Sequence, residues 1–346
     1  MIHRLLPTFA LLTILLTGCT PQANNPTGRE KWAARQIPAP KEPPIPPAVR
    51  FERIDPVLQS AAHKELESAL TSSDPLLRGN AIEALQNGEG MRAKAYFLSG
   101  LKSNDPPVRF ASAMAIGQLR IADAGADLRR MINDSDPLVS VGVRYALHRL
   151  GETQYTRDLQ ETARDPSRDV RGATAVVLGM LGEPTATRIL RPMLRDPEDG
   201  VRIQAAEALW RLGQEDGLKS LVAASASGYV DLQCVAMLGL AAPRDRRVLG
   251  HVRSGLTADF PEAQLVAARA AGMLGSDMGY AVAAGFVRSA DPRQRMLAAM
   301  ALGAIGRADA QSMLSELLKD KDAPVVRLAA AQALLQLQTS ATAAGN

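Results

Sequence analysis

The stretch "DPEDGVRIQAAEALWRLG", residues Asp196 to Gly213, decides the fold because its pattern recurs along the chain. Steps of 31 residues from Arg202 reach equivalent positions in both directions along the chain. The last step, to Arg327, is one residue longer. These nine positions, called marker positions below, are Arg78, Arg109, Ser140, Arg171, Arg202, Gln233, Gln264, Arg295 and Arg327. The seventh residue after each marker is Leu, Ile or Ala. Self-similarity at a fixed period indicates an array of repeated units.

Each unit contains two amphipathic helices. After Arg202, small or apolar residues follow at offsets three, four, seven and ten, which is the spacing of one face of a helix. A second stretch of this kind precedes the Asp-Pro pair, as in residues 186–196 and 310–320. Asp caps a helix start, Pro suits the first turn, and the Gly at the far end suits a C-terminal cap. Two short helices cannot bury their apolar faces alone, so neighbouring units must stack.

The units resemble HEAT repeats, specifically the short HEAT-like type named after phycobilisome lyases, with the pattern D-P-x-V-R-x-x-A-A-x-A-L-G-x-L-G. The best matching stretches are "DGVRIQAAEALWRLG" and "DVRGATAVVLGMLG", and the likeness covers about residues 55–337. It implies an all-α fold, an α-solenoid of about nine two-helix repeats with a 31-residue period over residues 51–338. With packed helices roughly 8–10 Å apart, nine units predict an open rod or arc on the order of 80 Å long.

Composition and charge agree with this fold and identify no partner. The chain is 22% charged and 46% apolar but only 4% aromatic, so its core must consist of Ala, Leu, Val and Met. The net charge is +4, and Arg residues at the markers account for part of the basic residues. The HEAT resemblance implies that these Arg side chains pair with Asp or carbonyl groups of the neighbouring turn, so we expect no nucleic-acid partner. The members of this predicted structural ladder are Arg78, Arg109, Arg171, Arg202, Arg295 and Arg327.

The N-terminus predicts export. "MIHRLLPTFALLTILLTGC" has a short basic start and an apolar run from Leu5 to Leu16, which is typical of a signal peptide over residues 1–18. Its ending, Leu16 to Cys19, resembles the lipobox of bacterial lipoproteins, which implies that Cys19 becomes the lipidated first residue of the mature chain. The alternatives are an ordinary signal peptide or an uncleaved anchor. Because Thr20 is not Asp, the resemblance implies a lipid-anchored, periplasm-facing protein of the cell envelope, in the outer rather than the inner membrane of a Gram-negative cell.

Residues 19–50 predict a tether between the lipid and the array. Eight prolines and few large apolar residues in 20–50 favour an extended chain, with polyproline II conformation near "PAPKEPPIPP". Trp32 in this tether is either an isolated aromatic residue or one that docks back on the array. The last residues, 339–346, predict a disordered tail.

No arrangement of residues predicts catalysis. The four His residues are far apart in sequence, and the chain has no metal-binding His pair, no Gly-rich phosphate loop and no G-x-S-x-G. Cys234 takes a position where other units have an apolar residue, which favours a packing role. The sequence therefore predicts a protein that is not an enzyme, with no cofactor, no metal and no small-molecule substrate.

The inner face of the array is the predicted binding surface. At 100° per residue, offsets one, five and eight point away from the buried side of the second helix, yet many residues there are apolar. We expect an exposed concave strip that binds a protein or peptide partner, as an envelope scaffold does. The alternatives are tight helix spacing, cover by the tether, an accessory, chaperone-like or lyase-like role for a cofactor protein, and a purely structural envelope spacer. The predicted strip consists of Phe110, Met114, Tyr145, Val176, Ile203, Glu207, Trp210, Leu238, Leu265, Met296 and Met300.

Overall fold

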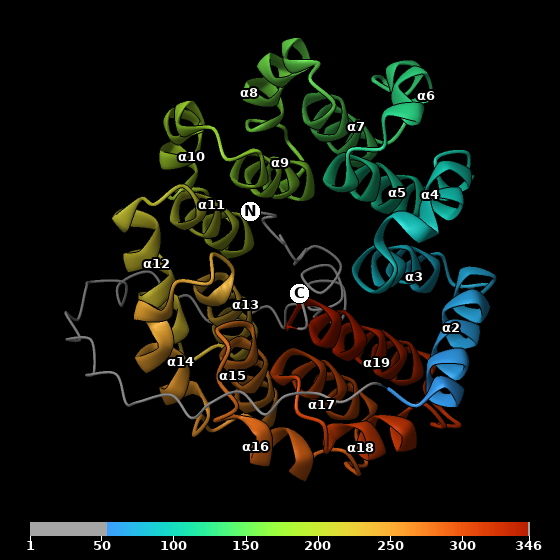
Figure 1. Ribbon diagram of the computed structural model, residues 1–346. Coiled ribbons are helices and arrows are strands. Elements are labelled where there is room, and N and C mark those ends of the chain that lie inside the picture. The colour runs from blue at the N-terminus through green and yellow to red at the C-terminus, as the bar shows by residue number, and fades with distance from the viewer. Residues whose placement is uncertain (1–53, 345–346) are drawn as a thin grey trace.

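The computed structural model describes residues 54–344, and within this range the chain is helical and contains no strand (Figure 1). One set of helices forms an inner layer and a second set, most of them shorter, forms an outer layer, so the predicted all-α solenoid is confirmed. The inner helices are α3 (Pro75–Gly88), α5 (Pro106–Leu119), α7 (Pro137–Arg149), α9 (Arg168–Leu181), α11 (Asp199–Arg211), α13 (Val230–Ala241), α15 (Pro261–Met273), α17 (Pro292–Ile305) and α19 (Pro324–Ala344). The outer helices are α2 (Pro56–Leu70), α4 (Lys94–Gly100), α6 (Gly125–Arg130), α8 (Leu159–Thr162), α10 (Thr187–Met193), α12 (Glu215–Ser225), α14 (Leu249–Gly255), α16 (Tyr280–Gly285) and α18 (Ala310–Leu317).

The ends of the inner helices follow the predicted rules. Asp136 accepts hydrogen bonds from the backbone N–H groups of Leu138 and Val139, at 2.8 and 3.3 Å, and Pro137 begins the helix. Such a cap satisfies donors that have no partner within the helix. At the far end, Gly182 and Gly306 adopt the left-handed conformation that suits glycine. The Asp-Pro pairs that precede the inner helices therefore gather on one rim of the array, which we call the Asp-Pro rim.

The array closes into a ring, whereas the sequence predicted an open rod or arc. Helix α19 packs against α2 and α3, so the last unit contacts the first (Figure 1). Arg327 on α19 donates a hydrogen bond to Glu65 on α2 at 2.9 Å. The backbone of Gly88 lies so close to α19 that an added Cβ would be 2.9 Å from Cβ of Leu335.

Small residues on the inner helices account for the curvature. A Cβ on Gly179 would lie 2.6 Å from Cα of Ala208 on the next inner helix, and one on Gly272 would lie 2.6 Å from the Ala304 carbonyl carbon. Neighbouring inner helices contact each other extensively, while the outer helices contact each other much less. Each unit is thus a wedge, narrow inside and wide outside. A small rotation between units adds up around the array until the ends meet.

Two further observations concern the chain ends and the membrane. Helix α19 runs to Ala344, where the sequence predicted a disordered tail from residue 339. None of the helices in 54–344 combines the length and apolar character that a membrane crossing requires. The predicted signal peptide and tether, residues 1–18 and 19–50, lie outside the described residues, and the first described helix begins at Pro56.

Candidate partner-binding surface

The predicted inner strip is mostly buried. Of its eleven residues, nine are buried and two, Phe110 and Met300, are partly buried. The nine buried residues are Met114, Tyr145, Val176, Ile203, Glu207, Trp210, Leu238, Leu265 and Met296. The expectation of a broad exposed apolar strip along the inner face was therefore wrong.

The burial has a geometric cause, because these positions point sideways toward the next inner helix. A Cβ built on Gly142 would lie 3.0 Å from Cδ2 of Phe110 and 3.6 Å from Sδ of Met114. Trp210 donates its indole N–H to the carbonyl of Leu240 on the next inner helix, at 3.1 Å. The helical angle predicts the direction of a side chain around its own helix, but the close helix spacing decides whether that side chain is exposed.

The inner face also carries buried charge, which an apolar strip would not. Glu207 and Arg211 form a buried ion pair at 2.8 Å. Burial lowers the pKa of Arg269 to about 10, and the attraction of Glu83 opposes this shift. Within the described part of the chain, no group accepts a hydrogen bond from Nη1 of Arg269.

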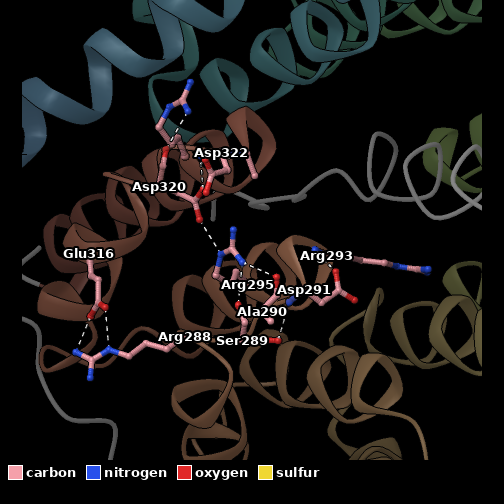
Figure 2. A network of polar contacts seen from close by, with 11 residues as sticks. Arg288, Ser289, Ala290, Asp291, Arg293, Arg295, Glu316, Asp320 and Asp322 are labelled. Carbon is pink, nitrogen blue, oxygen red and sulfur yellow. Dashed lines mark hydrogen bonds and ion pairs between the residues drawn. The ribbon is translucent and has the colours of Figure 1, made fainter.

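The predicted Arg ladder connects consecutive units along the Asp-Pro rim. Arg109 and Arg171 each place Nε and Nη2 on both carboxylate oxygens of an Asp in the next unit, Asp134 and Asp196, at 2.7–2.9 Å. Arg295 donates to the carboxylate of Asp320 in the next unit through Nε alone, at 2.7 Å (Figure 2). Two-point contacts of this kind fix geometry as well as adding attraction.

Each ladder Arg also ties down the turn before its own helix. Nη1 of Arg171 donates to the carbonyls of Asp165 and Pro166 at 2.9 and 3.0 Å, and Arg295 contacts Ser289 and Ala290 in the same way (Figure 2). The other members vary in their carboxylate partner: Arg78 bonds Asp105, Arg327 bonds Glu65, and Arg202 pairs with Asp199 on its own helix. The ladder thus runs through most units and extends across the ring closure.

The ladder carboxylates predict an acid-sensitive stability. Burial raises the pKa of the Asp196 carboxyl group, but the hydrogen bond from Arg171 and the other contacts of the carboxylate lower it by more. The pKa of Asp196 therefore lies below its usual value. The pKa values of Asp134 and Asp320 are lowered in the same way. A carboxylate with a lowered folded-state pKa stabilises the fold above its unfolded pKa of about 3.9, and this contribution is lost as the pH falls through the folded value. The free energy of unfolding, measured by urea titration, should fall between about pH 5 and pH 3.

The matched variant for this prediction is Asp196→Asn. It should be less stable than the wild type at pH 7, and its stability should change less between about pH 5 and pH 3. The control is Asp259→Asn, because Asp259 is an exposed carboxylate that is not part of the ladder. An Asp196→Asn variant with the full wild-type pH dependence would show that the Asp196 carboxylate does not contribute to it.

The ladder is interrupted at α7, whose marker is Ser140, and at the two adjacent inner helices α13 and α15. The markers of α13 and α15 are Gln233 and Gln264, whose amide groups donate to the turn carbonyls of Ser227 and Ala258. For the markers Arg202, Gln233 and Gln264, the position of the ladder carboxylate in the next unit is taken by Ser227, Ala258 and Ser289. This stretch therefore has no Asp where Asp134, Asp196 and Asp320 stand elsewhere.

Two aromatic side chains are exposed where the ladder is interrupted. Tyr229 and Phe260 are the residues before α13 and α15, and 61% and 41% of their surfaces are exposed. Asp fills the same position before α3, α5, α7 and α17. Because α13 and α15 are neighbours, the two rings stand on adjacent units of the Asp-Pro rim. We call this pair the aromatic rim site.

Charged side chains flank the aromatic rim site. Asp259 precedes Phe260 and is exposed. Asp231, two residues after Tyr229, forms an ion pair with Arg293 on α17 at 3.3 Å, so a side chain reaches past α15 to connect α13 with α17. Sequence reasoning missed this site because it followed the offsets after each marker. The available signal was the position four residues before the marker, where aromatic residues replace Asp in two adjacent units.

The family model that describes HEAT repeats matches residues 63–148, 156–239 and 249–335. The chain belongs to the HEAT-repeat family. These matches span most of the ring and coincide with the two-helix units described above. No curated protein matches the sequence.

Several solved structures resemble this HEAT-repeat ring at low identity. Human deoxyhypusine hydroxylase is 19% identical, with a TM-score of 0.35, over 82% of this chain and 98% of that one. YibA of Escherichia coli is 21% identical, with a TM-score of 0.34, over 72% and 96%. The complex of CpcE and CpcF of phycocyanin lyase from Nostoc is 19% identical, with a TM-score of 0.33, over 72% and 94%. Such likenesses carry no activity over to this chain.

Two His residues of the HEAT-repeat ring have carboxylate partners, and its cysteine is part of the core. His63 contacts Glu89 at 2.8 Å, and His148 contacts Glu183 at 2.6 Å. Cys234 is buried, as its apolar position predicted. Among residues 54–344, no group of three or more His, Cys, Asp and Glu side chains is arranged to hold a metal ion. Cys19, the predicted lipidation site, lies outside the described residues.

Proposed function

We propose that this HEAT-repeat ring is a non-catalytic scaffold of the bacterial cell envelope that binds a protein or peptide partner. The observation that carries the proposal is the aromatic rim site, which has two exposed aromatic side chains on adjacent units where the Arg–Asp ladder is interrupted. This location replaces the inner strip, whose residues are largely buried.

The chemistry of the aromatic rim site suits a partner contact. Tyr is enriched among residues that contribute strongly to interfaces, since its ring buries a large apolar area while its hydroxyl keeps a hydrogen bond. Among the residues whose exposure the structure describes, the other large exposed apolar ones are Val57, Leu76, Met91 and Tyr96, which belong to the first two units. The pair Tyr229 and Phe260 differs from them because it repeats one structural position in neighbouring units.

The anchor in this proposal is a lipid on Cys19. Two or three acyl chains would hold the protein on the membrane, because each buried CH₂ contributes about 0.8 kcal/mol. At about 3.1 Å per residue, the segment from Thr20 to Arg50 could span roughly 95 Å. The ring would then meet its partner at a distance from the bilayer, on the periplasmic side of the outer membrane in a Gram-negative cell.

The proposal predicts a site-specific crosslink in the native host. A photo-crosslinking amino acid at Tyr229 or Phe260 should give a discrete adduct with another protein, which mass spectrometry can identify. The control is Ser167, which precedes α9 at the equivalent position, is exposed and makes no side-chain cap.

The outcomes separate the proposal from its alternatives. An adduct at Tyr229 and Phe260 without one at Ser167 supports partner binding at the aromatic rim site. Equal adducts at all three positions would contradict a specific site. No adduct with another protein at any of them would favour the purely structural spacer.

A further inference from the structure

We infer that the inner layer of the ring holds a site for a phosphate group, formed by Arg120, Arg149 and the hydroxyl group of Tyr145. The site lies where the inner helices end, on the rim opposite the Asp-Pro rim. Arg120 follows the last residue of α5, and Arg149 is the last residue of α7. This site is distinct from the aromatic rim site and goes beyond the proposed function.

The end of α5 brings the three residues together. The carbonyl of Gly117 accepts hydrogen bonds from the backbone N–H of Arg120 at 3.3 Å and from Nε of Arg149 at 3.4 Å. Tyr145 precedes Arg149 by four residues, so both side chains lie on one face of α7. The ring of Tyr145 also packs against this glycine, since a Cβ on Gly117 would lie 2.8 Å from Cε1 of Tyr145. All three residues therefore meet at Gly117.

The hydroxyl group of Tyr145 has no protein partner, although the residue is almost completely buried. Only 1% of its surface is exposed. Across the residues that the structure describes, no hydrogen bond involves this hydroxyl group. A buried tyrosine hydroxyl normally has a hydrogen-bond partner. The unused hydroxyl therefore points to a ligand that accepts or donates a hydrogen bond here.

The charges that act on this hydroxyl group are all positive. Burial raises the pKa of Tyr145 to about 12, and three cations oppose this rise. They are Arg149, Arg211 and Arg120, which lie at the ends of α7, α11 and α5. Glu207 forms an ion pair with Arg211 at 2.8 Å and so neutralises it. The other two arginines form no ion pair with any residue of the described range, so two positive charges remain uncompensated.

The ends of the helices alone do not account for these arginines. A helix C-terminus attracts a cation through the partial negative charge on its last carbonyl groups. Arg149 uses only Nε for such a contact, and neither of its Nη atoms donates to a described residue. The side chain of Arg120 is exposed and also donates to none of them. Both guanidinium groups therefore have donors free for a ligand.

A phosphate group matches these free groups in charge and in number of oxygens. A guanidinium group donates two parallel hydrogen bonds to phosphate or carboxylate oxygens. A carboxylate brings one negative charge and two oxygens. A phosphate group brings up to two charges, which suits two arginines, and a third oxygen for the Tyr145 hydroxyl group. Because the pKa of Tyr145 is raised, the hydroxyl keeps its proton and donates it to that oxygen.

The test is isothermal titration calorimetry of the purified full-length protein with inorganic phosphate, at constant ionic strength and mildly alkaline pH. The wild type should bind one phosphate ion per chain. Arg120→Gln and Arg149→Gln should each weaken binding roughly tenfold, because each removes a charged hydrogen-bond donor. Tyr145→Phe should weaken it roughly threefold and keeps the ring that packs on Gly117, so it separates loss of phosphate from loss of the fold.

The matched control is Arg246→Gln. Arg246 is an exposed arginine at the start of η6 (Arg246–Val248), on the same rim of the ring. This variant should bind phosphate as the wild type does. Equal affinity in the Arg120→Gln and Arg149→Gln variants would overturn the inference, because phosphate would then bind elsewhere. Failure of the wild type to bind phosphate, or equally tight binding of acetate, would overturn it as well.

A second titration distinguishes the two sources of a phosphate group. The ligand is a short-chain phosphatidic acid, used below the concentration at which it forms micelles. Tighter binding than that of inorganic phosphate, lost in Arg149→Gln, would support the site and assign it to a phospholipid headgroup. Equal or weaker binding, alongside binding of inorganic phosphate that depends on Arg149, would support the site and assign it to a free phosphate-bearing solute.

Discussion

Replacing Gly179 with alanine should destabilise the ring by about 1–3 kcal/mol, although the change adds only one methyl group. The new Cβ would lie 2.6 Å from Cα and 2.7 Å from Cβ of Ala208, and a backbone atom cannot move aside as a flexible side chain can. Helices α9 and α11 must therefore separate. In a closed ring that separation affects every other interface, so the midpoint of urea unfolding should fall.

The matched control is Gly285→Ala. Gly285 ends α16 in the outer layer, and no atom lies within 4 Å of the position of an added Cβ. The same substitution there should leave stability unchanged or raise it by up to about 1 kcal/mol, because it restricts the unfolded chain. If both variants unfolded at the wild-type midpoint, close approach of the inner helices would not be what sets the ring's curvature.

Replacing Cys19 with serine should release the protein from membranes into the soluble fraction. A serine cannot form the thioether that a lipobox Cys carries, and without acyl chains little remains to hold the chain at a bilayer. Fractionation of cells, followed by immunoblotting of membrane and soluble fractions, measures the change. The effect should be close to complete, because the proposed anchor is the lipid alone.

Two controls make this prediction specific. Cys234→Ser, which changes the buried cysteine of α13, should leave the protein in the membrane fraction. Labelling with a radioactive fatty acid should mark the wild type and the Cys234→Ser variant but not the Cys19→Ser variant. Membrane association that persists without Cys19 would argue against lipidation and for an uncleaved anchor.

Much of the fold could be predicted from periodicity. The recurrence of Arg202 and its neighbours at a fixed spacing identified the two-helix unit, and the Asp-Pro pairs located the starts of many inner helices. These features depend on interactions within one unit or between two consecutive turns. Local patterns record such interactions well.

The ring closure and the buried inner face could not be predicted in the same way. Whether an array of wedges stays open or closes depends on a small rotation repeated at every unit, and a slight error in that rotation decides the outcome. Gly117, Gly179 and Gly272 were visible as small residues at one offset, but their effect on helix spacing required coordinates. The burial of Met114 and Tyr145 follows from that spacing.

The aromatic rim site was missed for a different reason. Tyr229 and Phe260 occupy a position where most units have an acidic or hydroxyl residue and four have Asp, so the signal was a departure from the repeat. Positions that break a local rule are often the ones that serve function, because a capping residue there would stabilise the helix better. In a repeat array, the exceptions to the pattern are therefore as informative as the pattern.

The contact between α19 and α2 gives this array a property that open solenoids lack. An open array needs polar end units, and it can unfold from either end because an end unit has only one neighbour. Here every unit, including the first and the last, has two neighbours. Unfolding of any unit must break two interfaces at once, so the whole ring should melt in a single cooperative step, and loss of one unit should expose an apolar surface on each side of the gap.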